Sequence, residues 1–259
     1  EISALCAAFN AGLPDLEELV RSIGFACELR RRHRVPVRGA VTTDIPGHPW
    51  ALVPVLARSG IRYLTTSVNA LYEQGGVFRA LEPRTPKPFR WVGPDSSELL
   101  VWNTGPGANY GSEGRDLGFY EDLAAVERRL PTGLAALEAS GYAYDQVSFR
   151  VGTDNRPPDR SLSDLVRDWN ARYLHPTVLL DTATGFLAGL EAACRGGFAA
   201  VRGDWTDWWL DGPGSSARET ALSREARERL LVAGAALGLG RLGARGNATD
   251  PALDAGATA

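Results

Sequence analysis

The sequence predicts an α/β protein in which most strands run parallel. Short apolar stretches of strand length alternate with longer amphipathic stretches of helical periodicity along most of the chain. Glycine, proline and acidic residues separate these stretches at almost every step. Strands that alternate with helices favour a parallel sheet with right-handed crossovers, either open or closed into a barrel.

The composition is typical of a soluble globular protein and excludes several classes of function. A chain of 259 residues suffices for one large α/β domain or two small ones. The net charge of −3 gives no electrostatic footprint for nucleic acid or an anionic membrane. No apolar run reaches the length of about 18 residues that would predict a membrane span. Cys6, Cys27 and Cys194 lack CxxC spacing, which argues against a disulfide framework or a cysteine zinc site.

The start of the chain predicts a fragment. The sequence opens on Glu1 and contains no methionine. We therefore expect an N-terminal part to be missing, and a signal peptide could have preceded it. The cellular location stays open for that reason, with the cytoplasm favoured.

The expected elements follow from start and stop signals. Pro14 and the acids after it open the first helix, and Pro36 ends it. Pro131 falls inside a predicted helix and is expected to break or kink it. The tail 240–259 is rich in glycine and alanine and is expected to fray. Strands are expected at 37–43, 61–68, 89–92, 98–103, 146–151, 177–181 and 199–201, and helices at 14–34, 50–59, 119–140, 162–173, 184–195 and 216–239.

The stretch 203–218, GDWTDWWLDGPGSSAR, is the first candidate for a binding site. The apolar face of a pyranose stacks on indole, and carboxylates accept hydrogen bonds from sugar hydroxyls, so this composition suits a sugar site. The alternative is a tryptophan-rich packing corner whose acids reach out to water. Its three tryptophans are Trp205, Trp208 and Trp209, and its three aspartates are Asp204, Asp207 and Asp211.

Two further acids follow predicted strands, Asp44 in TTDIPGH and Asp154 in GTDNRPPD. Sites of parallel α/β sheets gather at the carboxyl ends of the strands, so we expect both acids to face the tryptophan loop. Asp154 could act as a general acid, or it could cap amides in an ordinary turn. Asp44 could equally form an Asx turn. His48 could be a metal ligand or general acid, or a structural hydrogen-bonding group.

Several well-known motifs are missing from the sequence. No HxD, HxH or HExxH pattern occurs, so no complete metal site follows from local spacing. There is no P-loop and no GxSxG elbow. The GxGxxG match at Gly238, Gly240 and Gly243 ends a predicted helix instead of following a strand. Nucleotide binding and serine hydrolase chemistry are therefore disfavoured.

Four stretches together resemble the bacterial branch of glycoside hydrolase family 38, the zinc-dependent retaining α-mannosidases. They are TTDIPGHPWALVPVLARSGIRYL, FRWVGPDSSELLVW, VGTDNRPPDRSLSDLVRDWNARY and GDWTDWWLDGPGSSARETALSREA. They cover nearly the whole chain in consistent order. The resemblance implies the second part of a (β/α)7 barrel in residues 1–215. Residues 216–259 would then hold the first helix of a helical bundle and a frayed tail.

The resemblance also implies a mechanism. In that family, zinc binds two mannose hydroxyls and is held by an HxD pair, the nucleophilic aspartate and a late histidine. A second aspartate is the general acid and then the general base. Retention requires the two reacting carboxyls to lie about 5–5.5 Å apart. The metal orients and polarises the sugar.

The family's roles carry over onto particular positions of this sequence. Asp154 matches the acid/base, and Asp207 is the candidate zinc ligand in place of the family's histidine. The window expected to hold the nucleophile offers Asn10, which cannot form a glycosyl ester. The residues assigned to substrate binding are Asp44, Asn155, Trp205, Trp208 and Asp211.

The sequence thus predicts a retaining glycosidase that acts on an oligosaccharide or glycoside such as an α-mannoside. Zinc is the expected cofactor of the complete protein, and the chain as given is expected to be inactive alone. One alternative is a metal hydrolase that resembles polysaccharide deacetylases. Another is a carbohydrate-binding protein without catalysis. No nucleic-acid or membrane partner is expected, and the oligomeric state stays open.

Overall fold

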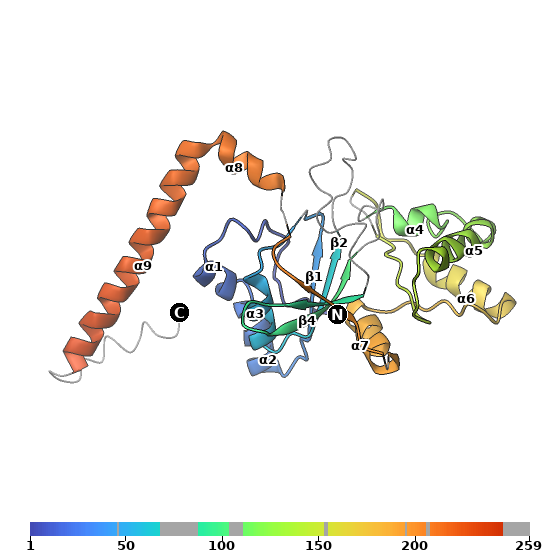
Figure 1. The fold of residues 1–259 in the computed structure, drawn as a ribbon, viewed down its shortest axis with the longest axis horizontal. Coiled ribbons are helices and arrows are strands. Elements are labelled where there is room, and N and C mark those ends of the chain that lie inside the picture. Colours follow the sequence, from blue (N-terminus) through green and yellow to red (C-terminus); the bar gives the residue numbers. More distant parts are fainter. Residues whose placement is uncertain are drawn as a thin grey trace. The chain divides into compact units, whose positions relative to one another are not determined.

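The computed structural model describes residues 1–45, 47–67, 88–103, 111–152, 155–194, 196–205 and 208–245. The chain divides into two compact units, Glu1–Trp209 and Leu210–Ala259. Each unit is described by itself. The first is an α/β unit built on one sheet, and the second is helical in its described part (Figure 1).

Within the residues that the structure describes, the sheet has five strands in the order β1-β2-β4-β3-β5. β1 (Gly39–Thr43), β2 (Tyr63–Ser67) and β4 (Glu98–Asn103) run parallel to one another. β3 (Phe89–Val92) is antiparallel to β4, and β5 (Ala199–Arg202) is parallel to β3. Most pairings are therefore parallel, which confirms the predicted α/β class and is consistent with part of an α/β barrel.

Seven helices of the first unit lie within its described residues. The predicted helix 14–34 is two helices, because the first one ends at Arg21 with Ser22 as its C-cap and the second begins at Gly24. Asp15 caps the first one in a reciprocal capping box with Glu18. Pro131 lies inside α5 as expected, and the helix continues past it. The helices are α1 (Leu16–Arg21), α2 (Gly24–His33), α3 (Leu52–Arg58), α4 (Glu113–Asp116), α5 (Leu123–Ala139), α6 (Leu162–Arg172) and α7 (Ala183–Ala193).

Apolar side chains cover both faces of the sheet, because successive residues of a strand point to opposite faces. Leu99 and Val101 of β4 belong to one buried cluster, which includes the buried residues of α3. Leu100 and Trp102 belong to another cluster with the buried residues of α7. Strands covered on both sides read as continuous apolar runs, which explains why LLVW was recognisable in the sequence.

Two predicted strands, 146–151 and 177–181, are not strands of the sheet. In each stretch, one residue has backbone hydrogen bonds to residues of a helix instead of to a neighbouring strand. The backbone N–H of Arg150 donates to Glu113 Oε2, and its carbonyl accepts from the N–H of Gly114. The N–H and carbonyl of Val178 bond to the side-chain amide of Asn170. The backbone groups of Arg150 and Val178 are thus satisfied without a ladder.

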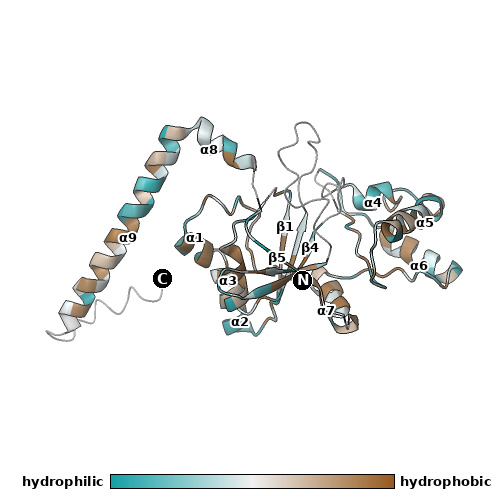
Figure 2. Ribbon diagram, in the orientation of Figure 1, coloured by the Kyte–Doolittle hydropathy of each residue, from teal (hydrophilic) through white to brown (hydrophobic). Residues whose placement is uncertain are grey.

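The second unit begins at Leu210, the last residue of a 3-10 turn, η1 (Trp208–Leu210). α8 (Asp211–Ser215) and the long α9 (Ala217–Arg245) follow. The helix thus runs past residue 239, where the sequence predicted a frayed tail. That residues 216–259 begin a helical bundle stays a prediction. Hydrophilic and hydrophobic residues alternate along α9 (Figure 2), and no helix among the described residues is long and apolar enough to cross a membrane.

Candidate functional site

Two of the segments singled out in the sequence meet at the carboxyl end of β2. Asp44 directly follows β1, and its backbone N–H donates to the carbonyl of Ser67 at 2.8 Å. Ser67 ends β2 and is fully buried, and its hydroxyl accepts from Arg150 Nη1 at 2.8 Å. Arg150 precedes Asp154 by four positions. The segment that carries Asp44 and the segment that leads to Asp154 therefore both contact one residue.

The start of the tryptophan loop joins the same region. The backbone N–H of Trp205 donates to the carbonyl of His48 at 3.0 Å. Asp204 Oδ1 accepts from the backbone N–H of Trp50. These two hydrogen bonds tie the residues that follow β5 to the residues that follow β1. The described neighbours of all three predicted acidic loops thus lie around the ends of β1 and β2.

His48 is a buried hydrogen-bonding residue at the centre of this region. Its Nε2 lies 3.2 Å from the hydroxyls of Thr42 in β1 and Thr66 in β2. Burial lowers the pKa of His48 to about 4, so the imidazole is neutral at pH 7. A neutral ring enclosed by two strands serves to hold them together, as the structural alternative for His48 anticipated.

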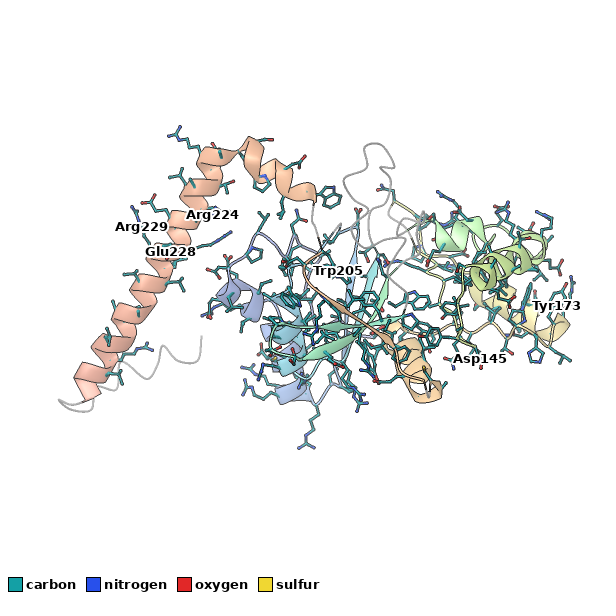
Figure 3. The ribbon with its side chains drawn as sticks, viewed as in Figure 1. Asp145, Tyr173, Trp205, Arg224, Glu228 and Arg229 are labelled. Carbon is teal, nitrogen blue, oxygen red and sulfur yellow. The ribbon has the colours of Figure 1, made fainter. Side chains whose placement is uncertain are left out.

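Trp205, labelled in Figure 3, packs into the buried core of the α/β unit. Only 5% of Trp205 is exposed, and its indole stacks on Trp91 with the ring centroids 4.6 Å apart. Phe89 covers it further, at a centroid distance of 5.7 Å. Trp205 therefore anchors the loop and does not present an open indole face to a sugar, which is the packing alternative for this residue.

The other predicted site residues are spread over the chain. Asn155 is exposed and has a left-handed backbone with φ of 52°. Asp211 begins α8 in the second unit and is exposed. Trp208 belongs to η1, but its side chain lies outside the description. Asp154 and Asp207 lie outside the described residues, so the convergence of the acids themselves stays a prediction.

The structure adds Asn103, which the sequence analysis missed. Among the described residues, three buried side-chain atoms have no hydrogen-bond partner: His48 Nδ1, Asn103 Oδ1 and Trp205 Nε1. Asn103 ends β4 in register with Thr66, which is itself in register with Thr42. His48 contacts both threonines and Trp205, so all three atoms belong to one end of the sheet. Unpaired buried polar groups are rare, and a bound polar group or water is the usual explanation.

The described residues do not fit a zinc site. Nowhere in the described ranges do three or more His, Cys, Asp or Glu residues come together as metal ligands would. Asn10 lies in the turn before α1, where its carbonyl accepts from the N–H of Leu13. Asp207, the candidate ligand, is outside the description.

Comparisons with known proteins support the fold. No family model matches the sequence, and no curated protein matches it. A crystal structure of an α-mannosidase from Enterococcus faecalis V583 matches 80% of this chain with a TM-score of 0.62 and 14% sequence identity. The match spans 22% of that longer chain. The fold of this chain is therefore similar to one part of an α-mannosidase.

Proposed function

We propose that this chain contributes the acid/base half of a retaining glycosidase site that acts on α-mannosides, as in glycoside hydrolase family 38. The observation that carries the proposal is the double contact at Ser67. The carbonyl of Ser67 accepts from the backbone N–H of Asp44, and its hydroxyl accepts from Arg150 Nη1. The similarity of the fold to part of an α-mannosidase supports it. A polar strand end of this kind is where α/β sheets and barrels bind their ligands.

In the proposed reaction, Asp154 is first a general acid. It protonates the glycosidic oxygen as that bond breaks, and then takes a proton from the water that releases the sugar from the enzyme. Asp44 accepts hydrogen bonds from sugar hydroxyls beside it. Asn10 cannot be the nucleophile, because an amide does not form a glycosyl ester, so the nucleophilic carboxylate is not assigned.

Zinc remains an expectation of the family resemblance. Asp207 is the proposed ligand from this sequence, since carboxylate oxygen is an accepted zinc ligand. Because the described residues form no site for the metal, we derive no step through it.

The variant Asp154→Asn tests the acid/base assignment in the full-length natural protein. Loss of the acid should lower kcat/KM by about 10²–10⁴-fold for alkyl mannosides, whose leaving groups need a proton. Activated aryl mannosides should lose far less, because their leaving groups depart without protonation. Asp159→Asn is the matched control, since Asp159 caps the local turn through Ser161 and should leave both rates within about two-fold.

Three results would contradict the proposal. Equal losses for both classes of substrate would remove the acid/base role from Asp154. Release of acetate from acetylated sugars would favour the deacetylase alternative instead. Sugar binding by wild-type protein without any hydrolysis would favour the carbohydrate-binding alternative.

A further inference from the structure

We infer that Arg150 is a substrate-binding residue of this site, whose guanidinium donates hydrogen bonds to a hydroxyl oxygen of the glycoside next to Asp44. The inference rests on the proposed function and adds a residue to it. It follows from how the backbone of Arg150 is held, from where its side chain goes, and from what the side chain contacts.

The backbone of Arg150 is fixed by α4. Its N–H donates to Glu113 Oε2 at 3.0 Å, and its carbonyl accepts from the N–H of Gly114 at 3.0 Å. The two elements approach closely here, because a Cβ on Gly114 would lie 2.8 Å from the Arg150 carbonyl oxygen. Two residues further on, the N–H of Gly152 donates to the hydroxyl of Tyr120 at 2.5 Å. The segment is thus held on both sides of Val151.

The alternation of side chains sends Arg150 toward the sheet. Phe149 and Val151 pack on the buried cluster that joins α5 and α6. In an extended segment, the residue between them points the opposite way. That direction takes the Arg150 guanidinium to the hydroxyl of Ser67, 83 positions earlier in the sequence, at the end of β2.

Both contacts at Ser67 are donated to it, because the backbone N–H of Asp44 donates to its carbonyl and Arg150 Nη1 donates to its hydroxyl. The two residues therefore bring two different side chains to this strand end. A guanidinium only donates hydrogen bonds and stays charged at all accessible pH values, whereas an ionised carboxylate such as that of Asp44 only accepts. A sugar hydroxyl does both, so a pair of this kind is complementary to it. Because Arg150 does not release its proton, its part in the reaction is binding and not proton transfer.

The test uses the full-length protein, with methyl α-mannoside as the probe and its dissociation constant measured by isothermal titration calorimetry. Arg150→Gln should weaken binding by about 10–100-fold, as for loss of a charge-assisted hydrogen bond. Arg150→Lys should weaken binding less, because it keeps a charge and a donor for Ser67 but loses the planar fork. Arg115→Gln, an exposed arginine on α4 itself, is the matched control and should bind like wild type.

Monodeoxy analogues of the probe separate binding from a structural role. If Arg150 contacts a sugar hydroxyl, the penalty of Arg150→Gln should vanish for the one analogue that lacks this hydroxyl. A merely structural role would give the same penalty with every analogue, and that result would overturn the inference. Gly114→Ala should weaken binding with the guanidinium still present, because the added methyl displaces the Arg150 backbone.

The outcomes distinguish this inference from the proposed function. Wild-type protein that neither binds nor hydrolyses mannosides would end both. A second outcome would overturn the role of Arg150 alone. In it, wild-type protein hydrolyses mannosides, Asp154→Asn slows alkyl mannosides more than aryl mannosides, and Arg150→Gln binds the probe like wild type. If Arg150→Gln fails to fold, Arg150→Lys with the monodeoxy series gives the same decision.

Discussion

The imidazole of His48 links three distant parts of the chain, and its titration can be followed in solution. Burial holds its pKa at about 4, against about 6.5 in an unfolded chain. Between these values the unfolded chain binds the proton more readily than the folded one. The contribution of His48 to the free energy of unfolding should therefore be fully present above about pH 6.5 and be lost as the pH drops toward 4. The loss should be about 3 kcal/mol.

Urea unfolding of wild type and His48→Gln at pH 7 and pH 4.5 measures this contribution. The variant should be less stable at pH 7, because it loses the bridge between Thr42 and Thr66. It should also lose much less stability than wild type between the two pH values. His33→Gln is the control, since His33 is exposed at the end of α2. Equal pH dependence in wild type and His48→Gln would show that folding does not lower the pKa of His48.

At the same scale, single residues show what the sequence could reveal of the site. Asp44 was predicted because it follows an apolar strand in a short turn, and the structure places it directly after β1. Arg150 and Asn103 were missed for a physical reason. Arg150 lies within a stretch that reads as a strand, and Asn103 stands where a turn residue is ordinary. Only contacts made across 83 positions of sequence and across neighbouring strands distinguish them.

Among the elements, α5 has a matched pair of glycines near its ends, Gly118 before the helix and Gly141 after it. Gly118 and Gly141 have nearly the same left-handed backbone, with φ of 89° and 88°. A Cβ on Gly118 would lie 2.7 Å from the backbone of Ala125 in α5, whereas a Cβ on Gly141 would meet nothing within 4 Å. Gly141→Ala should therefore cost only the strain of the left-handed conformation, about 1–2 kcal/mol. Gly118→Ala should cost about 1–3 kcal/mol more, because α5 must also move.

Chemical unfolding of the two variants measures that difference. Because both substitutions add the same methyl group at the same backbone angle, their difference isolates the packing of α5 on the turn. Equal losses of stability would mean that α5 accommodates the methyl group without cost.

The elements themselves divide into those that local sequence specifies and those that it does not. β2 and β4 were predictable because strands covered on both faces are continuously apolar. The stretches 146–151 and 177–181 have the same local signal but are not strands. The backbone groups of Arg150 bond to α4, and those of Val178 bond to Asn170. The break between α1 and α2 was missed because its residues continue the apolar periodicity of a single helix.

At the scale of the whole molecule, the α/β unit has a core of its own. Every residue of its three buried clusters precedes Leu210. A protein that ends after Trp209 should therefore unfold cooperatively, with a urea midpoint close to that of the α/β transition in the longer chain. Circular dichroism and tryptophan fluorescence measure both transitions. Non-cooperative unfolding of the shortened protein would show that the α/β unit needs the residues after Trp209.

The sequence by itself determined the α/β class, most of the strands, and the loops in which polar residues follow them. These features depend on the order of apolar and polar residues along a few turns of chain, which is local information. The tertiary structure decided which extended segments join the sheet, that Trp205 is packed and not open, and that Arg150 reaches Ser67 beside Asp44. Those outcomes depend on which hydrogen-bond and packing partners arrive from distant parts of the chain, and no local pattern contains that information.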